Sequence, residues 1–353
     1  MYQTVHFRAA QTSWKDPRTK VTVATVGEFK VELARLAEEF SIDAAEVDRA
    51  SLLPIDHLDA LAKLGLYGAF APVAEGGLGM ELPELCGVVE ELAVGCLAST
   101  FVWIQHFRLL AAVLFDEATA TLAALRTKVI RGELKGGVAL SGLLPGPPRL
   151  TATPTAGGWI LNGDAPWVSG WGLIDELFVA ARGPDDTVVN LLVTPDEQPG
   201  LLVIRHQLAA INATATVGLS FESLAVDRDR FVSQVALDPG QESGVGLRLN
   251  GSLALGVTRR CCSLIGESSL DDELRDARAD LDAADVETMP KARARASALA
   301  ARAASTLCVH RGSSSVLSGD VAERTSREAT LLLTFGSRPA IRASLFDQLA
   351  STP

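Results

Sequence analysis

Cysteine and histidine often bind metals or act as nucleophiles, and their spacing here excludes several kinds of site. The chain has five cysteines and five histidines. Neither type occurs at metal-ligand spacing, so we expect no metal site. The cysteines follow no disulfide framework, which indicates a reduced, cytoplasmic protein with buried, inert thiols. His57, His106 and His206 are isolated, and we expect surface or hydrogen-bonded side chains rather than catalysts. Motifs of P-loop and nucleophile-elbow enzymes are absent.

Length and charge limit the architecture and the partners. The 353 residues are enough for two or three packed domains, and 48% are hydrophobic. The net charge of −11 disfavours a nucleic-acid partner, because such a surface repels phosphate backbones. No uninterrupted apolar run reaches the ~18 residues of a membrane span, so we predict no span. Residues 1–25 are polar, lack the apolar core of a signal peptide and are expected to form a tail.

The spacing of the apolar residues indicates which helices and strands must position a site, and this spacing changes twice along the chain. Residues 26–135 have helical spacing: Phe29, Leu33, Leu36 and Phe40 form one stripe. Further helices are predicted over Ile55–Leu64, Leu82–Ala98, Phe101–Phe115 and Thr119–Arg131.

Residues 136–240 consist of short β-prone runs separated by turn residues such as Gly157–Gly158 and Asn162–Gly163. Regular spacing of this kind predicts a small β-barrel or sandwich.

Residues 241–353 are helical again. Pro290 is expected in the first turn of a long helix, Lys291–Leu317, which is rich in alanine. Small side chains let helices approach closely, so we expect this helix in a bundle core or at a subunit interface, and we predict a dimer or tetramer assembled through the C-terminal helices. The order of helices, sheet and helices predicts an α+β chain of three regions.

Two glycine-containing segments carry a family resemblance. Leu64-Gly65-Leu66-Tyr67-Gly68 precedes a loop, Pro72-Val73-Ala74-Glu75-Gly76-Gly77-Leu78-Gly79. Further along, Gly157-Gly158-Trp159-Ile160-Leu161-Asn162-Gly163 precedes Pro166-Trp167-Val168-Ser169. In this order the segments resemble the acyl-CoA dehydrogenase family. The resemblance implies that family's fold, bound FAD and an acyl-CoA or similar substrate.

The resemblance implies flavin contacts at Trp167, Val168 and Ser169, where the family has Trp-Ile-Thr. There the tryptophan packs against the flavin ring and the hydroxyl hydrogen-bonds near its reactive edge. The alternative is that Trp167 is a core residue of the β-domain. Ser141 ends a strand where the family has Thr-Glu-Pro, and its hydroxyl and amide would face the pyrimidine end of the flavin. The alternative for Ser141 is a hydroxyl that caps a turn.

A segment near the C-terminus also resembles the family but lacks its catalytic residue. The family has Glu-Arg-x-x-Arg-Asp-Ala and later Tyr-Glu-Gly-Thr. Arg324, Arg327 and Glu328 retain the charges, for which an ion-pair network is a sufficient explanation. Ser337 retains the hydroxyl that touches the flavin pyrophosphate. Phe335 stands where the family has its catalytic glutamate, and a phenyl ring cannot accept a proton.

No substitute base is evident. Some relatives carry the glutamate on an earlier helix, but Val245–Ser252 contains no acid, and Glu242 is the nearest. The family's Arg-x-x-Phe-Gly is also missing. His310 and Arg311 are alternatives as phosphate contacts, or as cations that suit a helix C-terminus.

The expected function is a FAD-dependent oxidoreductase of acyl-CoA dehydrogenase type, with an unknown catalytic base. The first alternative is a non-catalytic subunit that pairs with a base-bearing homologue in a hetero-oligomer. The second keeps the flavin but changes the chemistry to nitroalkane oxidation or hydroxylation. In each case we expect a homo- or hetero-oligomer.

Overall fold

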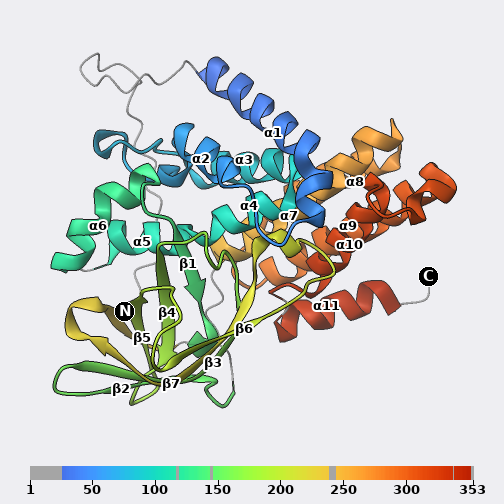
Figure 1. Cartoon of the computed structure of the whole chain (residues 1–353). Coiled ribbons are helices and arrows are strands. Elements are labelled where there is room, and N and C mark those ends of the chain that lie inside the picture. The colour runs from blue at the N-terminus through green and yellow to red at the C-terminus, as the bar shows by residue number, and fades with distance from the viewer. Residues whose placement is uncertain (1–25, 117–118, 144–145, 238–243, 337, 351–353) are drawn as a thin grey trace.

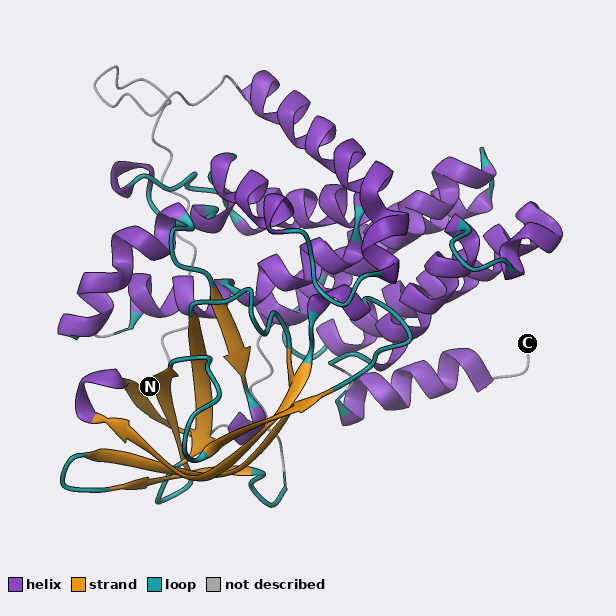
Figure 2. Ribbon diagram, in the orientation of Figure 1, coloured by secondary structure: helices purple, strands orange, loops and turns teal. Residues whose placement is uncertain are grey.

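The computed structural model describes residues 26–116, 119–143, 146–237, 244–336 and 338–350, and it has the predicted order of helices, sheet and helices (Figure 1). Helices form one part of the molecule, and the strands gather beside them (Figure 2). The expected α+β architecture is therefore confirmed.

The N-terminal helices follow the predicted pattern but not all of its boundaries. They are α1 (Val26–Arg49), α2 (Ile55–Lys63), α3 (Leu82–Gly95), α4 (Leu97–Gln105), α5 (Phe107–Phe115) and α6 (Ala120–Arg131). Leu33, Leu36 and Phe40 are buried on α1, as a 3.6-residue period requires. The predicted helices Leu82–Ala98 and Phe101–Phe115 were wrong at their boundaries. Cys96 is extended, with φ −142°, so the second of these helices begins at Leu97.

The central strands form one eight-stranded sheet in the order β6-β7-β3-β2-β4-β5-β8, with β1 beside β4. Their bounds are β1 (Gly136–Ala139), β2 (Leu150–Pro154), β3 (Gly158–Val168), β4 (Glu176–Arg182), β5 (Thr187–Val193), β6 (Leu201–Arg205), β7 (Val217–Asp227) and β8 (Phe231–Ala236). One parallel pair, Thr151 with Arg182, joins β2 to β4. Leu161 of β3, Val179 of β4 and Phe221 of β7 lie in one apolar core. A core shared by these strands fits the small barrel or sandwich predicted.

The C-terminal helices form the expected bundle. They are α7 (Gly244–Ile265), α8 (Ser269–Ala283), α9 (Met289–Arg311), α10 (Val321–Thr334) and α11 (Pro339–Ala350). Pro290 lies in the first turn of α9, as predicted. The helix ends at Arg311 rather than Leu317, because Gly312 has φ +67° and a 3₁₀ turn, Gly312–Val316, follows.

The alanines of α9 do not form the exposed surface that a subunit interface requires. Ala294, Ala296, Ala300 and Ala303 are fully buried within the chain, where α9 packs against α7, α10 and α11. The small side chains serve close helix packing inside the bundle.

By length and composition alone, one described stretch, Leu97–Phe115, could cross a membrane. It consists of α4 and α5, which meet at His106, and 72% of its apolar window is buried inside the chain. Core helices pass the same criteria, so this is weak evidence, and the described residues contain no clear membrane span.

Candidate functional site

The end of β3 presents one exposed aromatic ring. Trp167 is 66% exposed, whereas Val168 is fully buried and Ser169 is 8% exposed. The β3–β7 pairing shifts register between Ala165 and Val168. A bulge of this kind re-aims a side chain. The alternative that Trp167 is a core residue is therefore wrong.

The exposed Trp167 ring lies beside the ring of His206, with the two ring planes inclined by 45°, and this pair is called the Trp167 shelf. The Trp167 ring lies 5.0 Å, centroid to centroid, from the ring of His206. His206 Nε2 donates to Pro166 O at 2.9 Å, which fixes that ring against β3. Opposite the bulge, Gly218 pairs with the exposed Ile204, and a Cβ on Gly218 would lie 3.2 Å from His206 Nε2. The absence of a side chain at Gly218 leaves room for His206, and the exposed Trp167 ring offers one aromatic face on which a planar ring such as a flavin can stack.

Three hydroxyl groups form a chain directly after the ring. Ser169 Oγ lies 2.7 Å from Thr216 Oγ1, which lies 2.8 Å from Thr214 Oγ1. All three residues are buried, and Thr214 is fully buried. Ser169 follows Trp167 by two residues and is the most exposed of the three hydroxyl residues, at 8% against 5% for Thr216 and 0% for Thr214.

A strained loop holds the two threonines in place. Ile211 and Ala215 have φ of 49° and 46°, a left-handed conformation that costs roughly 1–2 kcal/mol for each non-glycine residue. The backbone N–H groups of Gly170 and Trp171 donate to the carbonyls of Thr214, at 2.7 Å, and Ala215, at 3.3 Å. These bonds tie the loop to the end of β3. Strain of this kind often occurs at functional sites.

Ser141 begins a tight 3₁₀ turn, Ser141–Leu143, and is 6% exposed. A Cβ on Gly142 would lie 2.5 Å from Ala180 O, so the turn packs directly on the β4 backbone. Arg182 Nε and Nη2 each donate to Gly142 O at 3.3 Å. The turn also contacts β3, so the structure brings Ser141 to the strand that carries Trp167.

Phe335 is partly buried at the end of α10 and contacts an N-terminal helix. Its ring packs edge to face on Phe101 of α4, with centroids 4.6 Å apart. The next residue, Gly336, has φ +59°, and a Cβ there would lie 3.5 Å from Asn250 Nδ2 on α7. The predicted residues Ser337 and Glu242 lie outside the described residues. Within that described part, no ring contact or hydrogen bond joins Phe335 to Trp167.

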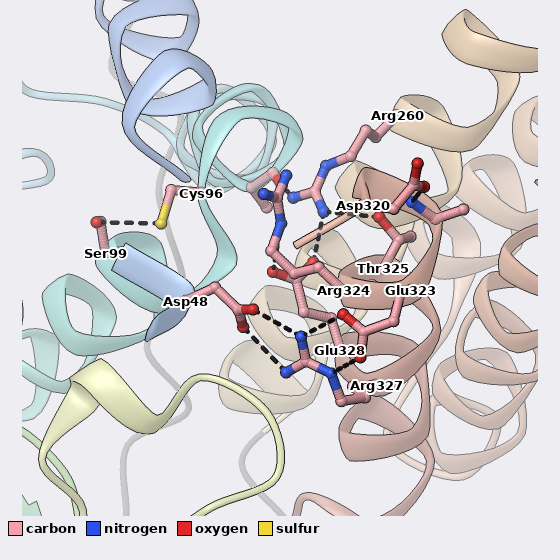
Figure 3. A network of polar contacts seen from close by, with 12 residues as sticks. Asp48, Cys96, Ser99, Arg260, Asp320, Glu323, Arg324, Thr325, Arg327 and Glu328 are labelled. Carbon is pink, nitrogen blue, oxygen red and sulfur yellow. Dashed lines mark hydrogen bonds and ion pairs between the residues drawn. The ribbon is translucent and has the colours of Figure 1, made fainter. Parts of the chain in front are cut away.

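The charged residues of α10 form the predicted ion-pair network (Figure 3). Arg260 of α7 pairs with Glu328 and donates to Val94 O at 2.8 Å. Arg327 pairs with Asp48 of α1 at 2.6 Å. Burial lowers the pKa of Arg324, whose Nε has no hydrogen-bond acceptor among the described residues. The network joins α1, α7 and α10.

The remaining candidates have structural roles. Arg311 donates to Asp320 at 2.7 Å, which favours a role at the helix end over a phosphate contact. Four cysteines are buried and Cys308 is partly buried. The described residues contain no cluster of His, Cys, Asp and Glu that could hold a metal. Burial lowers the pKa of His106 to about 3, and its Nδ1 accepts from Gly136 N at 3.0 Å.

The chain matches one family model and several curated proteins. Residues 27–125 match the family described as acyl-CoA dehydrogenase, N-terminal domain. The L-evernosamine nitrososynthase of a Micromonospora species is 27% identical over 72% of this chain and 61% of its own length. The benzylmalonyl-CoA dehydrogenase of Aromatoleum aromaticum is 26% identical over 64% of this chain and 63% of its own length. The chain thus spans about three fifths of the length of these relatives.

Solved structures share the fold. Butyryl-CoA dehydrogenase from Megasphaera elsdenii has a TM-score of 0.75, 17% identity and coverage of 92% of this chain and 98% of its own. A dibenzothiophene monooxygenase from a Paenibacillus species has a TM-score of 0.75, 19% identity and the same coverage. Structures of this fold include complexes with FMN and with FADH2. The resemblance to the acyl-CoA dehydrogenase family is confirmed, and the relatives are flavoenzymes of that family.

Sequence reasoning missed three neighbours of the site. Phe101 carries no signal, because an apolar residue on a helix indicates only a core position. Thr214 and Thr216 could have been noticed as alternating hydroxyls before a strand. Their link to Ser169 depends on the hydrogen bond between Ser169 and Thr216, which lie 47 positions apart in the sequence.

Proposed function

We propose that this chain is a flavin-dependent oxidoreductase that oxidises a small molecule without removing an α-proton from a thioester. The observation that carries the proposal is the contact of Phe335 with Phe101 at 4.6 Å. By the sequence resemblance, Phe335 stands where the family has its base, and Val245–Ser252 contains no acid.

The cofactor that we propose is FAD. It would lie against the exposed face of Trp167, with Ser169 at its edge and the turn at Ser141 nearby. When bound, the flavin supplies the redox chemistry. Trp167 would cover one face of the ring, and Ser169 would hydrogen-bond its edge.

The chemistry that needs no α-proton base is oxygenation of an electron-rich atom. The nitrososynthase and the dibenzothiophene monooxygenase, by their names, oxidise nitrogen- and sulfur-containing compounds. The balanced reaction is substrate plus O₂ plus reduced flavin, giving oxygenated substrate, oxidised flavin and water. A separate reductase would supply the reduced flavin. An acyl-CoA thioester remains a possible substrate, oxidised elsewhere than at its α,β-carbons.

The test compares two assays of the flavin-loaded chain. In the first, a panel of acyl-CoA thioesters is added without oxygen, and bleaching of the flavin is followed. In the second, chemically reduced flavin, oxygen and simple amines or sulfides are supplied, and products heavier by one oxygen are sought by mass spectrometry. We expect slow or no bleaching and product in the second assay. Bleaching at ordinary enzyme rates would contradict the proposal.

A second candidate is a subunit that completes its site with a homologous chain. It is favoured by exposed apolar side chains near the C-terminal ends of the bundle: Val309, Val316, Leu317 and Phe346. Such side chains at this density often mark a protein interface. Sedimentation at micromolar protein tests assembly, and Phe346→Asp should dissociate it. Colourless protein that becomes yellow only with a homologue would favour this candidate.

A further inference from the structure

Three hydroxyls in a row have three hydrogens but only two bonds between them. Ser169, Thr216 and Thr214 are joined at 2.7 and 2.8 Å, and geometry alone allows either atom of each pair to donate. One of the three hydroxyl hydrogens must therefore point away from the other two hydroxyls. Its direction decides whether Ser169 offers a hydrogen or a lone pair to its neighbour.

Thr214, at the buried end of the hydroxyl row, cannot accommodate the extra hydrogen. Thr214 is fully buried, and among the described residues its hydroxyl has no acceptor other than Thr216. A buried donor without an acceptor is destabilising, whereas an unused lone pair costs less. Thr214 therefore donates to Thr216, and Thr216 donates to Ser169. The remaining hydrogen belongs to Ser169, the outermost member.

We propose that Thr216 and Thr214 are positioning residues that fix Ser169 as a hydrogen-bond donor toward a flavin on the Trp167 shelf. This inference rests on the proposed function, because that function supplies the acceptor. The acceptor is the ring nitrogen N5 of oxidised flavin, which has a lone pair. Reduction places a hydrogen on N5, and the fixed donor then faces another donor. The row of three hydroxyls would thus favour binding of the oxidised cofactor over the reduced one.

The strained loop supports this role. Ile211 and Ala215 adopt left-handed conformations, and the loop carbonyls accept from Gly170 and Trp171. The loop holds both threonine hydroxyls in line with Ser169 at the point where β3 ends.

The first experiment tests the order of the hydroxyls without flavin. In apo-protein, Ser169→Ala leaves the Thr216 hydrogen without an acceptor, whereas Thr214→Val removes only a donor to Thr216. Ser169→Ala should therefore lower the melting temperature more than Thr214→Val does. Thr258→Val, which removes a fully buried hydroxyl on α7 that bonds Ala254 O, is the matched control for loss of a threonine hydroxyl. The opposite order of melting temperatures would overturn the inference.

The second experiment tests the effect on flavin. Thr216→Val should weaken binding of oxidised flavin about tenfold relative to reduced flavin, raising the two-electron midpoint potential by about 30 mV. Thr216→Ser should restore both values, and Thr258→Val should leave them unchanged. Equal losses in Thr216→Val and Thr216→Ser would overturn the inference, because space rather than the hydroxyl would then matter. Wild-type protein that takes up no flavin would instead overturn the proposed function, while the melting order would still report the hydroxyl arrangement.

Discussion

Phe335 at the end of α10 and Phe101 on α4 pack edge to face, with ring centroids 4.6 Å apart and planes inclined by 72°. This contact links the C-terminal bundle to the N-terminal helices at the position where the related dehydrogenases are expected to hold a carboxylate. Aromatic pairs of this geometry contribute about 0.5–1.5 kcal/mol beyond their buried area. Phe335 therefore has a packing role that a glutamate would not fulfil.

The first prediction concerns the chemistry lost at Phe335. A positioned general base typically contributes ~10²–10⁴-fold to rate, so the wild-type chain should be a poor acyl-CoA dehydrogenase. Phe335→Glu should gain flavin reduction by some acyl-CoA thioester, measured by anaerobic stopped-flow absorbance.

Phe335→Gln is the control, because it has the size of glutamate but cannot accept the proton. Equal rates in both variants, with flavin bound, would point to an altered substrate pocket rather than a missing base. The glutamate is also expected to lower stability, because it replaces a ring that packs on Phe101 with a partly buried charge.

The order of the regions was predictable because it depends on local periodicity. The stripe of Leu33, Leu36 and Phe40 and the turns at Gly157–Gly163 are each set by residues close in sequence. The helix breaks at Cys96 and His106 were not predictable, because the apolar pattern runs through both positions. There, tertiary packing outweighs local propensity.

The site was predictable only in part. Trp167 and Ser169 were found by resemblance, and the structure places both at the end of β3. Phe101, Thr214 and Thr216 were missed because their relevance depends on contacts with residues distant in sequence. Of the two roles expected for α9, the structure favours the bundle core, and the sequence could not choose because small side chains indicate close packing but do not say against what.

The second prediction concerns the buried network. Glu328 is 4% exposed and lies between Arg260 and Arg324, each 5% exposed. Glu328→Gln leaves these guanidinium groups without their shared carboxylate. Breaking a buried ion pair from one side typically costs about 3–5 kcal/mol. The free energy of unfolding, measured with urea, should fall by that amount.

Glu323→Gln is the matched control, since Glu323 is more exposed and pairs with Arg327 at 2.8 Å. It should cost less than about 1 kcal/mol. If the two variants lose similar stability, the buried carboxylate does not have the role that we assign to it.

The third prediction concerns pH. Burial lowers the pKa of His106 to about 3 in the folded chain, whereas an unfolded histidine has a pKa near about 6.5. At pH values between these two pKa values, His106 is protonated in the unfolded chain but neutral in the folded chain. Stability from the neutral ring is therefore present above about pH 6.5 and is lost as pH falls toward the folded pKa. Folding should weaken by about 2 kcal/mol between pH 7 and pH 5 from this residue alone.

Urea unfolding at several pH values measures this dependence. His106→Gln should flatten the curve between pH 7 and pH 5, although it also lowers stability at pH 7 by removing the bond to Gly136. His310→Gln, at an exposed position on α9, should leave the curve unchanged. An unchanged slope in His106→Gln would show that another group is responsible.

The last prediction concerns Trp167, whose ring is 66% exposed beside His206. Because so little of the ring is buried, Trp167→Ala should leave the melting temperature of the apo-protein nearly unchanged. If a flavin covers the ring, the same change should weaken flavin binding by about 1–3 kcal/mol, roughly fivefold to 150-fold. Trp167→Phe keeps an aromatic face and should recover most of the affinity, as measured by flavin absorbance titration. A large loss of stability with unchanged flavin binding would mean that the ring supports the fold rather than the cofactor.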